Sequence, residues 1–297
     1  MQAIKRTFGF IFNHPLGKRH PFKALSRLMC WQLQSRLSPS KFIVKPFISP
    51  VKFYAKKGLT GITGNIYTGL HEFNDMAFLL HFLNATDLFF DVGANVGSYT
   101  LLASGIRKAK TIAIEPSADT ATLLNNNLVL NKLQELTVLI NAAAGADKGI
   151  LTFSKNKDTT NHIITGDEYP DPEFEKVNVI TIDSLTEKEK PLLIKIDVEG
   201  FETEVLKGMT VTLEQPELKA IIIELNGSGL RYGFNELQIH QLLLSNKFKP
   251  YYYDPFNRNL KLINSYGDHN TIYCRDMEFI NNRLKKSAGF KVMGEVI

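Results

Sequence analysis

The stretch Leu88-Phe-Phe-Asp-Val-Gly-Ala-Asn-Val-Gly97 decides the fold of this chain. It begins with a short apolar run and ends in a turn that carries two glycines. A short apolar run bounded by glycine is typical of a strand buried in a parallel sheet. Glycine permits a sharp turn and lets the backbone approach a ligand closely. The stretch therefore predicts a buried strand, a tight turn and a following helix, with a ligand site at the turn.

Strand and helix patterns alternate on both sides of this turn. Further strands are predicted at 111–116, 136–143, 192–197 and 218–225, and helices at 75–83, 118–131 and 202–208. Such alternation implies right-handed crossovers over a parallel sheet. The tyrosine-bearing segments 249–254 and 270–275 are expected to pair as antiparallel strands at one edge. We therefore predict an α/β protein with a Rossmann-like, mostly parallel seven-stranded sheet, an antiparallel edge strand and helices on both faces.

Composition limits the class of protein. The 297 residues are 44% hydrophobic, which is enough for a substantial core. The two cysteines, Cys30 and Cys274, have no metal-ligand or C-x-x-C spacing, which fits a reducing compartment. No run approaches the roughly 20 apolar residues that span a bilayer, and residues 1–12 lack the core and cleavage site of a signal peptide. We therefore expect a cytoplasmic protein that is peripheral at the membrane if its N-terminus binds lipid.

Charge divides the chain into two parts. Residues 1–71 contain twelve Lys and Arg and no Asp or Glu, so a net charge of +5 leaves the remainder at −7. Within this part, Leu25, Leu28, Met29 and Leu33 follow a helical spacing over 22–37. A basic region on an acidic body predicts an anionic partner or a membrane surface, and no nucleic acid is expected. The alternative is a basic surface that simply packs beside the acidic domain, and the sequence does not decide the oligomeric state.

The expected organisation has three parts. They are a basic N-terminal region of helical and turn elements at 1–66, a ligand-binding domain at 67–280 and a C-terminal tail at 281–297. Within the domain, the polar stretch 154–176 is predicted to be a loop or a lid, because structureless insertions of that length are usually functional or disordered.

Carboxylates follow the predicted strands and indicate the charge of the ligand. Asp91 ends the first strand, Asp197 and Glu199 end the fourth, and Glu115 follows the second. An acid about twenty residues after a glycine turn binds ribose hydroxyls in dinucleotide sites too, so Glu115 alone leaves the cofactor open. Acids at the other strand ends would repel a pyrophosphate and attract the ammonium and sulfonium groups of S-adenosylmethionine. We therefore predict S-adenosylmethionine as cofactor and keep a nicotinamide-dependent oxidoreductase as the alternative.

Three residues are predicted to be catalytic. Asp197 and Glu199 lie where a strand leaves the sheet, and His162 lies in the predicted lid, where it would accept a proton near neutral pH. Helix capping is an alternative role for Glu199, and Glu224 at the end of the fifth strand is a secondary candidate. Lys195 is expected to pair with a carboxylate rather than to catalyse. No metal site is predicted.

With these residues assembled, the chain resembles the FkbM family of S-adenosylmethionine-dependent methyltransferases over most of its length. The motifs that carry the resemblance are Asp91–Gly97 with Ser98-Tyr-Thr100, Ile114-Glu-Pro116, Asn125 and Asn131, Ala143–Gly149, Thr181-Ile-Asp183, Ile194–Gly200, Val205-Leu-Lys-Gly208, Glu224 and the lead-in Tyr67–Glu72. The departure is mild, with Ile182 standing where leucine is usual in the family.

The resemblance implies a class I methyltransferase fold and transfer of a methyl group to a hydroxyl of a sugar, glycan or secondary metabolite. The acceptor would then be a small molecule or a glycan. The cofactor residues implied by the motifs and strand ends together are Glu72, Asp91, Gly93, Ala94, Asn95, Gly97, Tyr99, Glu115, Pro116, Ala143 and Asp197. A noncatalytic binding protein that keeps this fold is a further alternative.

Overall fold

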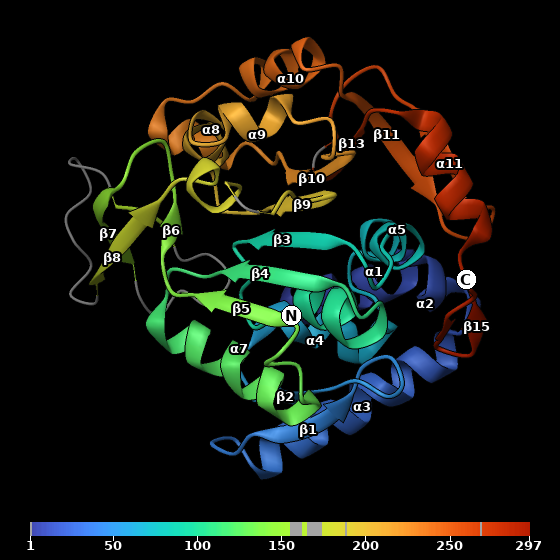
Figure 1. The fold of residues 1–297 in the computed structure, drawn as a ribbon. Coiled ribbons are helices and arrows are strands. Elements are labelled where there is room, and N and C mark those ends of the chain that lie inside the picture. The colour runs from blue at the N-terminus through green and yellow to red at the C-terminus, as the bar shows by residue number, and fades with distance from the viewer. Residues whose placement is uncertain (1, 155–161, 165–173, 188, 268) are drawn as a thin grey trace.

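A computed structural model describes residues 2–154, 162–164, 174–187, 189–267 and 269–297 (Figure 1). An eight-stranded sheet, in the order β12-β11-β13-β10-β9-β3-β4-β5, forms its centre. The strands are β3 (Leu88–Val92), β4 (Lys110–Ile114), β5 (Thr137–Ile140), β9 (Leu193–Ile196), β10 (Ala220–Glu224), β11 (Lys249–Asp254), β12 (Asn259–Leu262) and β13 (Asn270–Cys274).

The sheet places the glycine turn at a change of strand order. β3 pairs in parallel with β4 on one side and with β9 on the other, where Asp91 lies opposite Lys195. The parallel pairs β4–β5 and β9–β10 extend the sheet in both directions. Ligands of open α/β sheets bind in the crevice at the carboxyl ends of strands at such a switch point. The predicted Rossmann-like fold is confirmed, and its ligand crevice lies beside β3 and β9.

One part of the sheet differs from the expected seven strands with an antiparallel edge. The expected antiparallel pairing of β11 and β13 is present, but β13 lies inside the sheet, between β10 and β11. An additional strand, β12, forms the edge and pairs with β11. The turn between them is held by Asp254, whose Oδ1 accepts from the N–H of Phe256 at 3.0 Å. β12 is short and mostly exposed, so its sequence carries little strand periodicity.

Helices cover both faces of the sheet (Figure 1). One face packs against α5 (Phe73–Phe82), α6 (Ser98–Thr100) with the π-helical η1 (Leu101–Ile106), α7 (Ala118–Asn131) and α11 (Met277–Lys286). The other packs against α8 (Glu202–Lys207), α9 (Thr210–Glu214) and α10 (Glu236–Ser245). The neighbours Phe89 and Phe90 belong to opposite core clusters, as strand alternation requires. The apolar run of β3 is therefore buried on both sides.

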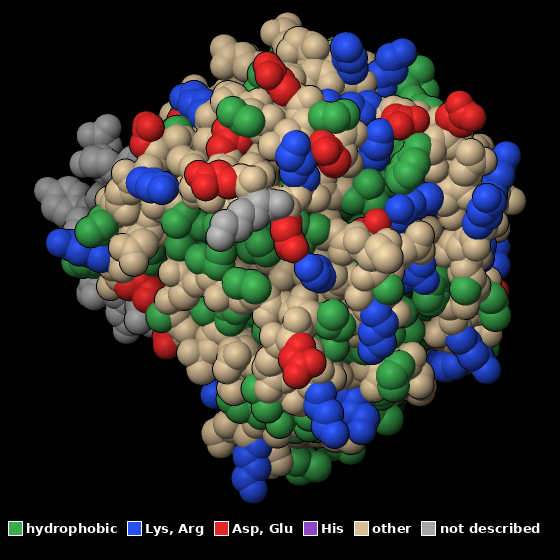
Figure 2. Space-filling view, viewed as in Figure 1, with side chains coloured by type: hydrophobic (Ala, Val, Ile, Leu, Met, Phe, Trp, Pro, Cys, Tyr) green, Lys and Arg blue, Asp and Glu red, His purple; other side chains and the backbone are tan. Residues whose placement is uncertain are grey.

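The N-terminal region forms helices and a hairpin that share the core of the domain. It consists of α1 (Gln2–Asn13), α2 (Pro15–Arg19), α3 (Pro21–Leu37), β1 (Ile43–Pro46), β2 (Lys52–Ala55) and α4 (Thr60–Thr68). Ile11, Leu16 and Trp31 are buried in the same apolar cluster as Phe73. Figure 2 shows Lys and Arg side chains over the lower part of the molecule, where β1 and α3 lie in Figure 1.

The C-terminal tail packs against this region. Its hairpin, β14 (Lys291–Val292) and β15 (Glu295–Val296), lies beside α2 and α3. Glu295 pairs with His20 at 2.9 Å, and the Nζ of Lys23 donates to the carbonyl of Met293 at 3.1 Å. The first and last segments of the chain are thus in direct contact.

The remaining elements flank the sheet. A three-stranded sheet in the order β6-β8-β7 is formed by β6 (Ala143–Ala144), β7 (Gly149–Ser154) and β8 (Phe174–Ile180), and the short helices are η3 (Asp183–Leu185) and η4 (Ser228–Tyr232). Most of the predicted lid at 154–176 lies outside the described residues. Among the helices that are described, none is both long enough and apolar enough to cross a membrane.

Candidate active site

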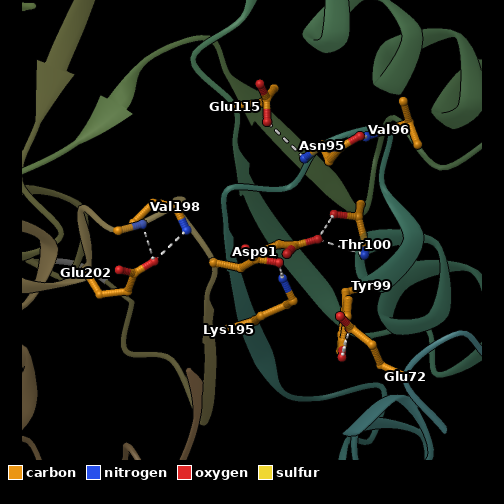
Figure 3. Close-up of polar contacts among 12 residues, drawn as sticks. Glu72, Asp91, Asn95, Val96, Tyr99, Thr100, Glu115, Lys195, Val198 and Glu202 are labelled. Atoms are coloured by element: carbon orange, nitrogen blue, oxygen red, sulfur yellow. Dashed lines mark hydrogen bonds and ion pairs between the residues drawn. The ribbon is translucent and has the colours of Figure 1, made fainter. Parts of the chain in front are cut away.

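A pocket of about 910 Å³ opens at the carboxyl ends of β3, β4, β9 and β10. Its lining brings together every predicted cofactor residue except Gly97, and also the predicted catalytic residues Asp197 and Glu199. Figure 3 shows Asp91 and Lys195 between Glu115 on one side and Glu72 with Tyr99 on the other. The pocket continues to residues of α1, α3 and α4.

The two glycines of the turn have different roles. Gly93 has φ of +78°, and a Cβ added there would lie 1.8 Å from the carbonyl oxygen of Asp197. The turn after β3 therefore closes tightly onto the end of β9. Gly97, with φ of +93°, does not line the pocket; a Cβ there would lie 2.3 Å from Leu124 of α7. Close packing of the turn on a helix thus explains Gly97, and its predicted cofactor contact stays a prediction.

Asp91 supports the turn from beneath. Its Oδ2 accepts from the N–H of Thr100 at 2.9 Å and from the Thr100 hydroxyl at 2.6 Å. It is buried, and burial raises its pKa above the ordinary value. One carboxylate oxygen therefore caps the helix after the turn while the residue also lines the pocket.

Glu115 holds the turn from the side of β4. Its Oε2 accepts from the N–H of Asn95 at 2.9 Å, and its Oε1 accepts from the N–H of Ser117 at 3.0 Å. Asn95 adopts φ of +50°, so its backbone N–H turns toward this carboxylate. Burial raises the pKa of Glu115 to about 7. With Pro116 beside it, this buried carboxylate forms the rim where ribose hydroxyls would be held.

Lys195 is the buried cation of the site. Its Nζ lies 2.7 Å from the Oδ2 of Asp197 and 4.8 Å from the centre of the Tyr99 ring. Burial alone would lower the pKa of Lys195, but the carboxylates of Asp197, Glu72 and Asp91 outweigh it and raise the pKa. The predicted structural pairing of Lys195 with a carboxylate is therefore observed.

Glu72 connects the helix α5 to the turn. Its Oε2 accepts from the hydroxyl of Tyr99 at 2.6 Å, and its side chain makes no capping hydrogen bond to α5. Burial, followed by the nearby Glu72 and Asp75 carboxylates, raises the pKa of Tyr99 well above its ordinary value. Tyr99 is therefore a neutral donor that orients Glu72 at the pocket wall.

Asp197, Glu199 and Glu224 form a cluster of carboxylates. Each offers an oxygen, and these oxygens lie within 4.8 Å of one another, which is a spacing that suits a metal ion although none was predicted. Burial and the neighbouring Asp197 raise the pKa of Glu199 to about 7 and that of Glu224 to about 9. The cluster is thus partly protonated near neutral pH, so it carries less negative charge than its composition implies.

The turn after β9 is held by a residue that sequence reasoning did not assign to the site. The Oε1 of Glu202 accepts from the N–H of Val198 at 3.0 Å and of Gly200 at 3.2 Å (Figure 3). Its pKa is raised to about 7 by burial. Glu199 sits in this turn with φ of +55° and is not the helix cap of α8, which begins after Phe201. Glu202, three residues after Glu199, is thus the side chain that accepts the backbone N–H groups of this turn.

His162 lies apart from the carboxylates. It is buried, its backbone N–H donates to the hydroxyl of Ser154 at 2.9 Å, and it does not line the pocket. Ile163, the next residue, lines the pocket and bridges to Phe153. The structure therefore brings Asp197 and Glu199 together but does not bring His162 to the pocket wall.

The N-terminal region supplies pocket residues that no sequence motif identified. Arg6, Trp31, Gln32 and Lys57 line the pocket and carry side-chain chemistry, and the lead-in motif Tyr67–Glu72 adds Tyr67 and His71 beside them. Helix α4 joins this part to the cofactor turn, because the Nδ2 of Asn65 donates to the hydroxyl of Ser98 at 3.0 Å. For the lining residues before Tyr67, the sequence signals were the basic composition and a helical spacing at 22–37, and neither specifies which side chains face the pocket.

The donor groups of the site fit a cationic cofactor. Carboxylates surround the crevice, and Lys195 is already neutralised by Asp197. A pyrophosphate in this crevice would face those carboxylates, whereas ammonium and sulfonium groups are stabilised by them. Gly93 also lines the pocket, so backbone rather than a side chain forms this part of the pocket wall. This arrangement supports S-adenosylmethionine and gives no support to the nicotinamide alternative.

Comparison with known proteins identifies the family. The model of the methyltransferase FkbM domain matches residues 91–250, which is more than half of the chain. A curated relative, the hexuronic acid methyltransferase AglP of Haloferax volcanii, is 30% identical over 153 residues, which are 50% of this chain and 59% of the relative. The match thus spans less than two thirds of that protein.

Solved structures with a similar arrangement are distant. The precorrin-6y C5,15-methyltransferase of Geobacter metallireducens GS-15 is 12% identical, with a TM-score of 0.42 over 75% of this chain and 93% of that one. A SAM-dependent methyltransferase of Agrobacterium tumefaciens is 8% identical, with a TM-score of 0.42 over 79% of this chain and 69% of that one. The family match confirms the predicted family and, with it, S-adenosylmethionine as the cofactor. The chain belongs to the FkbM methyltransferase family.

Proposed function

We propose that this protein transfers a methyl group from S-adenosylmethionine to a hydroxyl oxygen of a sugar or glycan. The observation that carries the proposal is the pocket itself, which is lined both by strand-end carboxylates and the turn of an FkbM domain and by residues of the N-terminal region. The sugar acceptor is supported by the similarity to a hexuronic acid methyltransferase.

Four residues would hold the cofactor. Glu115, fixed by two backbone N–H groups, would accept from ribose hydroxyls, and Ala143 would line the adenine. Glu72 and Asp91 supply negative charge for the methionine ammonium. When bound, S-adenosylmethionine supplies a methyl group that its sulfonium already activates for displacement.

The protein's own contribution is alignment and proton removal. Holding acceptor and donor in line within a pocket supplies roughly 7 to 11 kcal/mol in well-oriented systems, and general-base assistance contributes about 10²- to 10⁴-fold in rate. Of the two candidate bases, Glu199 has a pKa of about 7, near the optimum for accepting a hydroxyl proton at neutral pH. Asp197 is held by its ion pair with Lys195. It is therefore better placed to orient the acceptor hydroxyl than to accept its proton.

Glu224 has a different role in this scheme. Its pKa of about 9 keeps it protonated at neutral pH because of burial and the adjacent Asp197. A protonated carboxyl donates one hydrogen bond, so Glu224 would hold the Asp197 carboxylate or an acceptor oxygen.

The experiment is transfer of a labelled methyl group. The purified chain is incubated with methyl-labelled S-adenosylmethionine and a panel of glycosides, and the products are analysed for a label that is stable to mild base, as a methyl ether is and a methyl ester is not. Formation of such an ether together with S-adenosylhomocysteine is the expected result. Binding of S-adenosylmethionine without transfer to any member of the panel would favour a noncatalytic role, and transfer to nitrogen or to a carboxylate would contradict O-methylation of a hydroxyl.

A further inference from the structure

The two ends of the pocket carry opposite charge. Carboxylates line the end at the sheet, with Lys195 paired among them: Glu72, Asp91, Glu115, Asp197, Glu199 and Glu224. The end formed by the N-terminal region is lined by Arg6 and Lys57. That region contains no Asp or Glu before Glu72, so these cations have no acidic neighbour on their own elements. The carboxylates that would attract the cofactor's positive charge and these two cations therefore come from different parts of the chain.

The wall of the basic end suits a sugar ring. Trp31 lines the pocket from α3. The Nε2 of Gln32 donates to the hydroxyl of Tyr67 at 3.1 Å, which leaves the Tyr67 hydroxyl its own hydrogen to donate. Aromatic side chains beside a few fixed polar groups are the usual lining of a small-molecule site.

The basic end is also held at a fixed position relative to the cofactor turn. In α4, Asn65 donates to the hydroxyl of Ser98, and its Oδ1 accepts from the N–H of His71 at 2.7 Å. Asn65 is fully buried. Hydrogen bonds therefore link α4 to the helix that follows the cofactor turn, as alignment of an acceptor hydroxyl with a methyl donor requires.

We propose that this end of the pocket is the acceptor site and that Arg6 and Lys57 select a sugar bearing an anionic group. Guanidinium and ammonium groups bind both carboxylate and phosphate, so the shared chemistry is a negatively charged substituent. The inference rests on the proposed methyl transfer, since it assigns the acceptor of that reaction. It makes the N-terminal region, which lies outside the family domain, the part that determines specificity.

The test measures binding of three probes to the protein saturated with S-adenosylhomocysteine. Methyl β-glucuronide, methyl β-glucoside and methyl β-glucoside 6-phosphate are titrated by calorimetry. We expect at least one anionic probe to bind tenfold or more tightly than the neutral glucoside. The difference in affinity between the glucuronide and the 6-phosphate shows whether carboxylate or phosphate is preferred. Equal affinity for the charged and neutral probes, or no binding of either anionic probe, would overturn the inference.

Variants separate the acceptor site from general charge. Arg6→Gln and Lys57→Gln are each expected to weaken the anionic probe fivefold or more without changing the affinity for S-adenosylhomocysteine. Lys52→Gln is the matched control, because Lys52 is exposed on β2 and does not line the pocket. An equal loss in Lys52→Gln would show a nonspecific effect of charge and overturn the assignment. Failure to bind S-adenosylhomocysteine at all would instead contradict the proposed function.

A second, independent observation concerns the outer face of α3. Four large apolar side chains of this helix are exposed, with Phe22 86%, Met29 69%, Leu33 62% and Leu37 75% accessible. Their spacing of seven, four and four residues places them on one side of the helix. The opposite side is buried at Ala24, Leu28, Trp31 and Ser35. The predicted apolar stripe of this helix is therefore divided: Leu28 faces the core, but Met29 and Leu33 face outward.

Cations surround this exposed stripe. Phe42, just before β1, and Val44 in β1 are also exposed, and exposed cations lie near them in the chain at Arg36 and Lys41. In the lower part of Figure 2, over β1, hydrophobic side chains lie among Lys and Arg side chains. A second copy of the chain would bring like charges together, whereas an anionic lipid surface complements both features.

We infer that the outer face of α3 seats on a bilayer containing anionic lipid. Apolar side chains beside cations are the two signals that interfacial helices combine for stable attachment. Trp31, Gln32 and Ser35 on the inner side of the same helix line the acceptor end of the pocket. Attachment through α3 would therefore hold the acceptor end close to the membrane surface.

Vesicle flotation tests this surface. The protein is mixed with phosphatidylcholine vesicles that contain or lack 30% phosphatidylglycerol, and we expect flotation with the anionic vesicles at least tenfold above that with neutral ones. The triple variant Met29→Gln, Leu33→Gln, Leu37→Gln should lose it. The control triple variant Val138→Gln, Ile150→Gln, Val211→Gln, which changes exposed apolar residues elsewhere, should retain it. No flotation of the wild type, or equal loss in both variants, would overturn the inference, as would a dimer that only the α3 variant dissociates.

Discussion

The cofactor end and the acceptor end of the pocket are encoded differently. At the cofactor end, the chemistry lies in short motifs at strand ends, and Glu115 and Asp197 stand directly after β4 and β9. At the acceptor end, Arg6, Trp31 and Lys57 come from separate elements and meet only in the fold. A parallel sheet brings its carboxyl ends together by construction, whereas packed helices bring together whichever side chains their contacts allow. The residues of the family's shared cofactor site thus lie in short sequence motifs, whereas the residues proposed to select the acceptor are dispersed along the chain.

The largest effect is expected from a substitution at Asp197, on the catalytic side of the cofactor end. Asp197→Asn should lower kcat about 10²- to 10³-fold, because it removes the charge that pairs with Lys195 and aligns the acceptor. The Kd for S-adenosylmethionine should rise by less than tenfold. Steady-state kinetics and calorimetry measure both quantities, with Glu214→Gln on the exposed surface of α9 as control. Unchanged turnover would remove Asp197 from the catalytic residues.

The next effect separates binding from turnover. Glu115→Gln should weaken S-adenosylmethionine about 100-fold, because an amide cannot accept from both Asn95 and Ser117 with its two ends as the carboxylate does. Calorimetry on this variant and on Arg6→Gln sharpens the contrast, since Arg6→Gln should leave cofactor affinity unchanged. If the two variants behaved alike, the division into a cofactor end and an acceptor end would be wrong.

A smaller effect concerns pH. The folded pKa of Glu224, about 9, lies above the ordinary 4.5, so its protonation stabilises the fold fully below pH 4.5, and this contribution is lost as pH rises through 9. Glu224→Gln keeps a neutral side chain at every pH. Relative to wild type, the variant should therefore gain about 2 °C or more in Tm between pH 6 and pH 9.5. Parallel Tm curves for the two proteins would show that Glu224 does not titrate in this range.

The smallest expected effect is that of a chelator. Asp197 is already paired with Lys195, and Glu224 is protonated at neutral pH, so the cluster needs no metal to balance its charge. EDTA should change kcat by less than about twofold, because general-base catalysis by a carboxylate needs no metal ion. A large loss that Mg²⁺ restores would instead show that the oxygens of Asp197, Glu199 and Glu224 hold a cation.

The sequence predicted the elements whose signals are local. The helix expected at 118–131 is α7 with those bounds, because Ser117 caps it by accepting from the N–H of Thr120. The central strands were placed within three residues of their observed ends. Strand order was harder, since the position of β13 between β10 and β11 depends on pairing across the sheet.

The candidate site was predictable where a side chain follows a strand and not elsewhere. Gly97 has the composition of a ligand turn but is required by packing on Leu124. Glu202 lies in a helical pattern, and only the folded turn shows its bonds to Val198 and Gly200. A histidine in a polar segment has the chemistry of a base, but whether His162 reaches the pocket depends on a backbone path that sequence patterns do not specify.

The hairpin β14–β15 has a consequence for the order in which the protein is completed. Met293 and Ile297 are buried in the cluster that contains Ile11 and Leu28, and Val292 contacts Gly69 at the end of α4. During synthesis, α1 to α4 emerge long before these residues. This N-terminal part therefore reaches its final packing only after residues 292–297 have also been synthesised.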